Sequence, residues 1–481
     1  MDLPAGRRLP RPPSTDTPES VAGDTVIEMI VTRMDGRTAN DVAVAIGRLV
    51  TARALVPGDR LPTVRALAAG IGVSSSTVSD AWRILAHHGT IVTARRNGTT
   101  IRASRATLTG RHWQVPAEPG TLDLDLSTGT PDTALLPPLG PELRRLHTSA
   151  DLAITSYIDR PVLAELEHEL RRDWPFEPEA LTVVDGAMDA LDRLVVSLVH
   201  LGDTVVVENP TFPPLLDMLE LAGAEVIGVP LDHEGPDPTL FASALESGPV
   251  AVILQPRAHN PTGVTMSADR ARQLAGAIRQ AGAEGRPWII EDDHSAGIIT
   301  RPVASLGAHL PSTAVHIRSF SKSHGPDLRI AAVGGAADPV AAVVRRRQLG
   351  AAWTSRLIQH LLLSMLRSHS TAASVSAAAD TYSERRRRLR AALERHDIAV
   401  VAGDGLNVWL PVRDEHRASV ALAVSGIGVA PGHPFQVDGP MTLHQKDQAL
   451  SDTSPHIRVS LGSARGDLDV LAAQLAKAAT C

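Results

Sequence analysis

Lysine, cysteine and aromatic residues are all scarce in this sequence, and each scarcity narrows what the protein can be. Only three of the 481 residues are lysine, namely Lys322, Lys446 and Lys477, and arginine carries almost all the other positive charge. The single cysteine, Cys481, excludes an intramolecular disulfide and a thiolate metal cluster and fits a reducing cytoplasm. Aromatic residues make up 3% of the chain, so Leu, Val, Ala and Ile must fill most of the core.

Long hydrophobic runs are also missing. No stretch of about 18 uninterrupted apolar residues occurs, so no membrane span is expected, and the first twenty residues have no apolar segment typical of a signal peptide. An apolar content of 43% predicts a soluble globular protein with a large core. The length of 481 residues predicts two or three domains, and we expect a cytoplasmic location.

Charge is distributed unevenly along the chain. Residues 37–105 contain ten Arg and three Asp, with no Lys or Glu, so this stretch carries +7. The net charge of the whole chain is −6, so the remainder must carry −13. A basic segment joined to an acidic remainder is typical of a protein with an added nucleic-acid-binding domain. A surface made soluble by arginine would give the same asymmetry, and charge alone leaves both interpretations open.

The pattern of residues 24–103 predicts a winged helix-turn-helix, preceded by a disordered tail at residues 1–23 rich in Pro, Ser and Thr. A first helix begins near Asn40 or Asp41, either of which would cap it. Two short helices follow around a turn at residues 70–73, with Ser74 as the N-cap of the second. The buried face of that second helix is predicted to contain Val78, Ala81 or Trp82, and Leu85. Two β runs joined at Asn97-Gly98 predict a hairpin.

The stretch LVPGDRLPTVRALAAGIGVSSSTVSDAWRILAHHGTI resembles the DNA-binding domain of the GntR family of bacterial transcription regulators. The resemblance implies that double-stranded DNA is contacted by the following residues: Arg65, Ser74, Ser75, Ser76, Thr77 and Ser79, with Arg95, Arg96 and Asn97 in the wing. Small hydroxyls at the start of a helix can donate to phosphates while the helix enters the major groove. Ser75 stands where the family often has Arg, which disfavours a bidentate guanine contact there. A helix-turn-helix used only for dimerisation is the alternative.

Residues 104–121 contain Gly and Pro without periodicity and predict a linker. Beyond them, short β-like runs alternate with helical patterns, which is typical of an α/β domain. Three of these runs, VAVILQ, PWII and AVHI, are followed by Asn260, Asp292 and Lys322 respectively, at spacings of about one strand–helix unit. Open α/β sheets bind ligands at the carboxyl ends of their strands, so we expect these three side chains to converge.

An amine, a carboxylate and an amide on one rim suit pyridoxal 5'-phosphate (PLP). Only the amine of lysine, and not a guanidinium, can lose its proton near neutral pH and attack a carbonyl, so Lys322 would form the Schiff base. Asp292 would keep the pyridine nitrogen protonated, and Asn260 would bond the ring hydroxyl. The cofactor phosphate and ring would be held by a further set of residues: Ser319, Ser321, Arg329, the Gly186-Ala187-Met188 turn that opens a helix, and Phe212 over one ring face. The alternative is that Asp292 caps a helix and that Lys322 is a solvated surface charge.

The motifs SFSK with Arg329, NPTG and EDDH resemble those of fold-type I aminotransferases of class I and II, over about residues 122–458. The resemblance implies a large domain at 122–370 with the PLP site and a small domain at 371–481. It also implies that Arg458 binds a substrate or effector carboxylate, and that Tyr157 reaches the phosphate of the neighbouring subunit of a homodimer. His294 stands where many relatives have Tyr and would contact the ring hydroxyl. Pro214 stands where some fused regulators carry an arginine.

A GntR-type reader fused to an aminotransferase-like domain resembles the MocR subfamily of regulators over roughly residues 37–465. The resemblance implies a homodimeric transcriptional regulator in which PLP, or PLP with an amino-compound effector, biases DNA binding. One alternative is a working PLP-dependent aminotransferase that carries a DNA-binding domain. Another is a DNA-binding protein whose large domain no longer holds cofactor. The arginine run SERRRRLRAALERH predicts an exposed helix face, with a second DNA contact as the alternative.

Overall fold

The computed structural model describes residues 23–34, 36–51, 54–55, 58–87, 91–94, 98–101, 122–148, 160–282, 286–437 and 454–481. The chain divides into two compact units, Met1–Leu108 and Thr109–Cys481. The tail predicted at residues 1–23 lies outside the described residues except for Gly23, and so does the predicted linker at 104–121. The domain bounds taken from the sequence therefore stay predictions. No helix in the described part of the chain is long and apolar enough to cross a membrane.

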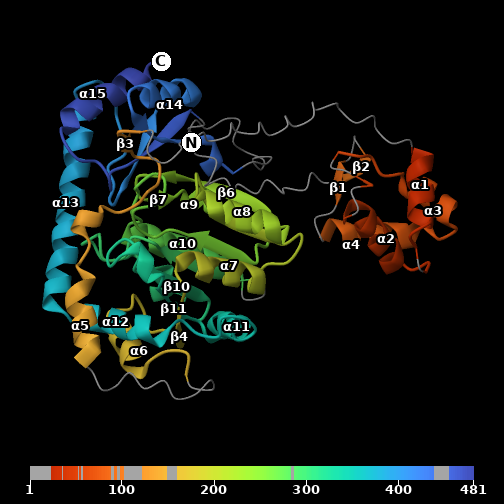
Figure 1. Ribbon diagram of the computed structural model, residues 1–481, viewed down its shortest axis with the longest axis horizontal. Coiled ribbons are helices and arrows are strands. Elements are labelled where there is room, and N and C mark those ends of the chain that lie inside the picture. The colour runs from red at the N-terminus through yellow and green to blue at the C-terminus, as the bar shows by residue number, and fades with distance from the viewer. Residues whose placement is uncertain are drawn as a thin grey trace, which may run out of the picture. The chain divides into compact units, whose positions relative to one another are not determined.

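The first unit is a winged helix-turn-helix (Figure 1). Its elements are α1 Gly23–Val31, α2 Ala39–Thr51, α3 Val64–Ile71, α4 Ser75–His87, β1 Ile91–Ala94 and β2 Gly98–Ile101, the two strands pairing antiparallel. Helix α1 has no counterpart among the predicted elements, because nine residues are a short window for a helical pattern. Val26 and Ile30 lie four positions apart on this helix. Both side chains are completely buried in the core of this unit.

The turn of the helix-turn-helix has the predicted local chemistry. Gly72 ends α3 in the left-handed region at φ 70°, where a residue without Cβ is favoured. The Ser74 hydroxyl accepts a hydrogen bond from the Thr77 N–H at 3.1 Å and so caps α4. The cap predicted for α2 is wrong. Thr38 and Asp41 form a reciprocal capping box, in which each backbone N–H donates to the other side chain, so the helix begins at Ala39.

The second unit contains an eight-stranded mixed sheet with helices on both faces (Figure 1). In spatial order the strands are β4 Ala180–Val184, β11 Ala331–Gly335, β10 Ala314–Ser319, β9 Trp288–Asp293, β8 Ala251–Leu254, β5 Thr204–Asn209, β6 Glu225–Asp232 and β7 Gly235–Pro236. Strands β10, β9, β8, β5 and β6 run parallel to one another. The pairs β10–β11, β11–β4 and β6–β7 are antiparallel. Parallel strands covered on both faces are almost wholly apolar, as β8 is.

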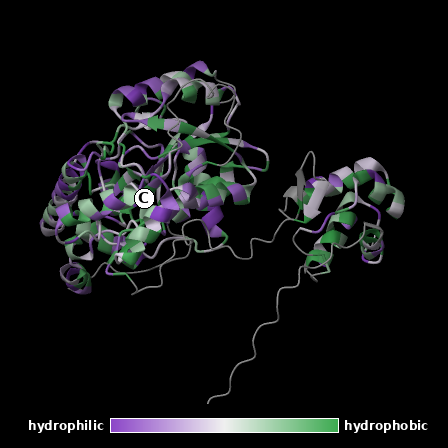
Figure 2. Cartoon of the chain, turned by 90° about the horizontal axis from the view of Figure 1, so that it is seen from above, coloured by the Kyte–Doolittle hydropathy of each residue, from purple (hydrophilic) through white to green (hydrophobic). Residues whose placement is uncertain are grey.

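Two apolar clusters hold the helices to this sheet. One contains side chains of α7 Ala187–Leu198, α8 Pro213–Ala222 and α11 Ala337–Gln348, and the other contains those of α9 Pro238–Leu245 and α10 Ala268–Gln280. The hydropathy colouring shows hydrophobic and hydrophilic segments together on many helices, as expected for helices with one buried face (Figure 2). The remaining helical elements of this lobe are α5 Leu139–Thr148, α6 Ala164–Arg171, α12 Arg356–Leu366, and the 3-10 turns Leu306–Ala308 and Pro326–Leu328. The 3-10 turn Thr133–Leu135 instead contacts α13 His369–Glu394.

A smaller lobe completes the second unit. Its elements are α13 His369–Glu394, β12 Asn407–Pro411, α14 Glu415–Val424, β13 Ile427–Gly428, β14 Ala430–Pro431, the turn His433–Phe435, β15 His456–Ser460 and α15 Leu468–Ala479. Strands β12, β15 and β14 form one antiparallel sheet. Strand β3, Leu124–Asp125, pairs parallel with β13, so the chain that enters the second unit first joins this smaller lobe. The long helix α13 runs alongside both lobes (Figure 1).

Candidate cofactor and effector site

Strands β8, β9 and β10 are parallel neighbours, and Asn260 and Lys322 follow the carboxyl ends of β8 and β10 as expected. Strand β9 differs from the prediction because it continues through the EDD motif, so Asp292 is part of the strand. Asn260 is buried in the loop after β8, and Lys322 is partly buried in the turn after β10. The sheet order alone brings them together, because each strand ends at the same edge.

Asp292 is a buried carboxylate at the carboxyl-end edge of the sheet. It is buried, its Oδ2 accepts a 2.8 Å hydrogen bond from Gln255 Nε2, and its Oδ1 has no hydrogen-bond partner among the described residues. Burial raises the pKa of Asp292 to about 6. An orphaned buried carboxylate oxygen is costly unless a donor approaches it, so a protonated ring nitrogen fits this position.

Lys322 has the opposite shift. Burial, together with the charge of Arg458, lowers the pKa of Lys322 to about 8, so a substantial fraction of its amine is neutral near physiological pH. Its Nζ donates to the Gly129 carbonyl at 3.1 Å. The neighbouring His294 is partly buried, and burial plus the Lys322 charge lower its pKa to about 3, so its imidazole is neutral. A neutral amine beside neutral imidazole is the state that can attack an aldehyde.

Gln255, which the sequence reasoning missed, connects the predicted residues. Its Nε2 orients Asp292, its Oε1 accepts the Asn260 N–H at 2.8 Å, and its own N–H donates to Glu208 at 2.7 Å. Glu208 and Gln255 are almost wholly buried, and burial raises the pKa of Glu208 well above its usual value. The only sequence signal was a polar residue closing an apolar strand, VAVILQ.

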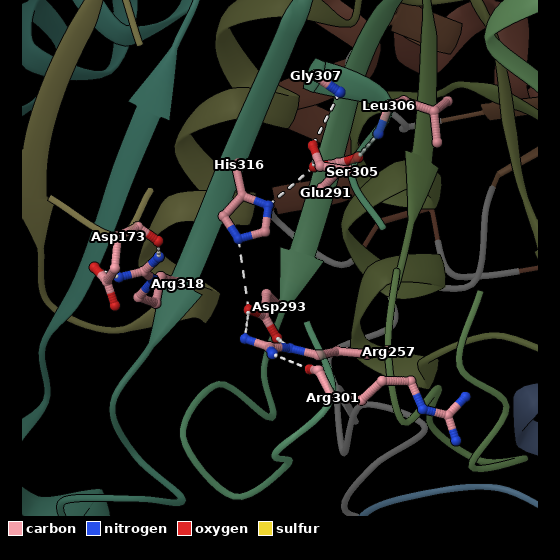
Figure 3. Close-up of polar contacts among 10 residues, drawn as sticks. All are labelled: Asp173, Arg257, Glu291, Asp293, Arg301, Ser305, Leu306, Gly307, His316 and Arg318. Atoms are coloured by element: carbon pink, nitrogen blue, oxygen red, sulfur yellow. Dashed lines mark hydrogen bonds and ion pairs between the residues drawn. The ribbon is translucent and has the colours of Figure 1, made fainter. Parts of the chain in front are cut away.

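The other face of β9 contains a buried ionic network (Figure 3). His316 lies between Glu291, at 2.9 Å from Nδ1, and Asp293, at 3.5 Å from Nε2. Burial by itself would lower the pKa of His316, but the hydrogen bonds to Asp293 and Glu291 outweigh it and raise the pKa. Arg257 holds Asp293 through two bonds, at 2.8 and 2.6 Å. This network fixes the strand that presents Asp292 on the opposite face.

Arg458 extends from β15 of the smaller lobe into the site and is buried. Its Nη1 donates to Asn260 Oδ1 at 3.2 Å, its Nη2 donates to the Ser127 carbonyl, and its Nε has no partner among the described residues. Burial lowers the pKa of Arg458 to about 10, so it keeps its charge at neutral pH. A buried guanidinium with a spare donor can bind a carboxylate in a bidentate manner.

The predicted phosphate-binding residues form two local contacts, one between Gly186 and Arg329 and one between Ser319 and Ser321. Gly186, at φ 105°, precedes α7 without a side-chain cap, and a Cβ built there would lie 2.9 Å from Arg329 Nη2. The first N–H groups of α7, at Ala187 and Met188, therefore lie beside an arginine. Ser319 is buried at the end of β10, and its Oγ accepts the Ser321 N–H at 3.3 Å. Phe212 immediately precedes α8, which begins at Pro213 and Pro214, positions that suit proline. Tyr157 lies outside the described residues.

The predicted DNA-binding residues lie at the helix-turn-helix. Arg65, Ser75, Ser76 and Ser79 are exposed, and Thr77 is partly exposed. Ser74 is committed to its cap, and its hydroxyl also lies 2.7 Å from that of Ser76. The wing residues Arg95, Arg96 and Asn97 lie outside the described residues.

Fold and site together define a GntR-type DNA-binding domain joined to an aminotransferase-like domain of fold type I. The sequence matches the family of aminotransferases of class I and II over residues 123–475 and the gntR family of bacterial regulatory proteins over residues 38–101. The fold is similar to that of the α-aminoadipate aminotransferase LysN from Thermus thermophilus, with a TM-score of 0.64 at 20% identity, over 75% of this chain and 92% of that one.

Two transcriptional regulators are similar in sequence to this chain. The vitamin B6 salvage pathway transcriptional repressor PtsJ of Salmonella typhimurium is 36% identical over 85% of this chain and 93% of that protein. The probable rhizopine catabolism regulatory protein MocR of Rhizobium meliloti is 26% identical over 56% of this chain and 60% of that protein. The chain belongs to the MocR-type family of transcriptional regulators, in which a GntR helix-turn-helix precedes an aminotransferase-like domain. The regulator interpretation is thereby favoured over that of a working aminotransferase that carries a DNA-binding domain.

Proposed function

We propose that this regulator binds PLP in its second unit and that the bound cofactor, alone or with an amino compound, sets its affinity for operator DNA. Two neighbouring groups carry the proposal: a buried Asp292 Oδ1 that has no partner in the described part of the chain, and a lysine whose pKa is lowered to about 8. Structural ion pairs rarely leave a carboxylate oxygen buried without a partner. When bound, the cofactor supplies an aldehyde and an electron sink.

Each residue of the site has a proposed task. Lys322 would hold the cofactor covalently, and Asp292 would keep its ring nitrogen protonated. Asn260 has its Oδ1 taken by Arg458, which leaves its Nδ2 to donate to the ring hydroxyl, and the neutral His294 would be a second donor. Phe212 would cover one ring face. The phosphate would be held by the residues beside the start of α7, which are Gly186, Ala187, Met188, Arg329, Ser319 and Ser321.

The effector is proposed to carry an amine and a carboxylate, because Arg458 offers a buried bidentate donor in the same site as the lysine. The name of the relative PtsJ, a repressor of vitamin B6 salvage, supports PLP itself as a sensed ligand of this chain too. The two proposals are compatible, because an amine can compete with Lys322 only for a cofactor that is already bound.

DNA is proposed to bind the exposed face of α4. Arg65, Ser75, Ser76 and Ser79 would contact the operator, with Thr77 beside them and the wing residues 95–97 completing the interface. Ser74 is better placed to hold α4 than to reach a phosphate, because its hydroxyl already accepts the Thr77 N–H.

A homodimer is proposed as the binding form. Leu143 on α5 and Leu357 on α12 are each about half exposed, and these two helices pack together. Exposed leucines on adjacent helices favour burial against another protein surface. Light scattering of the purified protein should give twice the mass of the 50.9 kDa chain, and a monomer mass with full cofactor binding would contradict this part of the proposal.

Catalytic turnover is the second candidate, favoured by the retention of Lys322, Asp292, Asn260 and Arg458 in one site. Visible spectroscopy of the protein with PLP, titrated with a panel of amino acids, separates the two. A band of covalently bound cofactor that shifts and then remains would mark a sensor. Steady conversion of the cofactor to its amine form would mark an aminotransferase, and no band at all would refute the cofactor proposal. The Lys322→Ala variant is the control.

A further inference from the structure

A segment of backbone that carries no predicted function contacts both ligand-binding side chains. Residues 127–130, with the sequence STGT, follow β3 and cross the site. The carbonyl of Gly129 accepts a hydrogen bond from Lys322 Nζ at 3.1 Å, and the carbonyl of Ser127 accepts one from Arg458 Nη2. Gly129 is in the left-handed region at φ 65°, and a Cβ there would lie 3.8 Å from Arg458 Nη1. The backbone therefore lies directly against both side chains.

The chain before this segment is fixed to the smaller lobe. The Leu124 N–H donates to the Gly426 carbonyl at 3.0 Å, and the Leu126 N–H donates to that of Gly428 at 2.8 Å. In the opposite direction, the Ser460 N–H of β15 donates to the Leu126 carbonyl at 2.9 Å. These are strand-like bonds, so residues 124–126 must move together with β13 and β15.

Asp132 fixes the chain after the segment to the same lobe. Its carboxylate is 2% exposed and bonds Arg385 of α13 at 2.8 Å as well as Arg465, and its N–H donates to the Tyr382 hydroxyl at 2.9 Å. Burial would raise the pKa of Asp132, but the two arginines lower it to about 2. The segment is therefore held at both ends by the smaller lobe and reaches the larger lobe at Lys322.

Covalent attachment of the cofactor and the bond to Gly129 compete for one atom. The Lys322 ammonium has three N–H donors, one of which serves Gly129. When the neutral amine attacks an aldehyde, a carbon–nitrogen double bond forms, the carbon–oxygen bond breaks, and both amine protons leave with that oxygen as water. The nitrogen would then carry at most one proton, which leaves it fewer donors for the Gly129 carbonyl. A ligand carboxylate bound to Arg458 would likewise compete with the Ser127 carbonyl for the Nη2 donor of Arg458.

We propose that the Gly129 carbonyl is a latch on Lys322: attachment of the cofactor releases the latch, the smaller lobe moves with residues 122–135, and this movement changes the affinity for DNA. This inference rests on the proposed function and adds the structural route by which cofactor attachment would change DNA binding. Sequence connectivity supports this path, because the described chain resumes at Leu122 directly after the linker from the DNA-binding unit. A ligand that breaks a bond present in one arrangement shifts the balance between two arrangements.

Two substitutions at Lys322 separate the latch from the covalent link. Lys322→Met removes the donor, whereas Lys322→Arg keeps a donor but cannot form the link. The probe is a labelled duplex selected from a random pool with cofactor-free wild-type protein, and binding is followed by fluorescence anisotropy. Without cofactor, the Met variant should match PLP-loaded wild type within about twofold, and the Arg variant should match cofactor-free wild type. A Met variant that binds DNA like cofactor-free wild type, while PLP changes the wild-type affinity, overturns the latch.

Hydrogen exchange distinguishes failure of the latch from failure of the proposed function. If PLP attaches, as its visible band reports, but leaves DNA affinity unchanged, the proposed function fails. The latch is then tested by the hydrogen-exchange rates of the backbone amides of residues 126–132 in cofactor-free protein. These amides should exchange several-fold faster in Lys322→Met than in wild type, and equal rates overturn the latch.

Asp132→Asn tests the path beyond the latch, because it weakens the attachment of the segment to α13 without touching the site. The ratio of DNA dissociation constants with and without PLP should fall toward one, while PLP binds as in wild type. Asp232→Asn is the matched control, since Asp232 also holds a buried arginine, Arg270, through two bonds of 2.7 and 3.0 Å. An unchanged ratio in Asp132→Asn refutes the path.

Discussion

Asp292→Asn should stabilise the cofactor-free protein at alkaline pH while weakening its hold on PLP. The pKa of Asp292 is raised to about 6 by burial, against a usual value of about 3.9. A carboxyl whose pKa is raised by folding costs nothing when both states are protonated. Its cost grows as pH rises from about 4 to about 6 and is complete above that range. A rise of about two pKa units lowers the free energy of unfolding by about 3 kcal/mol at pH 8 and by about half of that at pH 5.

Asparagine keeps an oxygen for Gln255 Nε2 but adds an amide nitrogen without an acceptor, at a cost of about 1 kcal/mol. The net gain should therefore be about 2 kcal/mol at pH 8 and close to zero at pH 5. Asp293→Asn is the matched control on the same strand. Burial would raise the pKa of Asp293, but His316 and Arg257 hold it well below its usual range, and its loss would leave Arg257 unpaired. That variant should lose about 3–5 kcal/mol at neutral pH.

Urea unfolding of cofactor-free protein between pH 5 and pH 8 measures both variants. The reasoning is refuted if Asp292→Asn is less stable than wild type at pH 8, or if its advantage does not shrink toward pH 5. PLP should raise the unfolding midpoint of wild type more than that of Asp292→Asn, because only the carboxylate gains a charged partner from the ring nitrogen.

Three further predictions follow from single contacts of the described residues. Gln255→Leu should weaken PLP binding about ten- to a hundredfold, because it leaves Asp292 Oδ2 and the Asn260 N–H without a hydrogen-bond partner. A fluorescence titration measures this loss. Gln255→His keeps a donor and should recover part of it. The rate of covalent PLP attachment should rise about tenfold from pH 6 to pH 7 and level off above about pH 8, following the pKa of Lys322; a rate that still rises steadily at pH 9 would contradict the lowered value. Ser74→Ala should destabilise the winged helix by about 0.5–2 kcal/mol in thermal unfolding, whereas Ser79→Ala, which loses a hydroxyl bond within α4, should cost less.

Local patterns predicted much of the architecture. The helix-turn-helix could be predicted because its cap at Ser74, its left-handed turn at Gly72 and its buried stripe are set by residues a few positions apart. The start of α2 was misplaced because Thr38 and Asp41 cap it reciprocally, and Asn40 and Asp41 have the same propensity as a cap.

The sequence by itself determined which residues reach the edge of the sheet, because alternating strands and helices predict parallel strands that end at one edge. The order of the strands came from the structure. Only the tertiary structure decided what those residues touch there. Gln255 meets Asp292 across 37 positions, Lys322 meets Gly129 across 193, and Arg458 meets Ser127 across 331. Such contacts depend on how lobes pack and on which backbone carbonyl faces a side chain, and no local periodicity encodes either. For that reason the lysine could be found from the sequence, whereas the backbone latch on it could not.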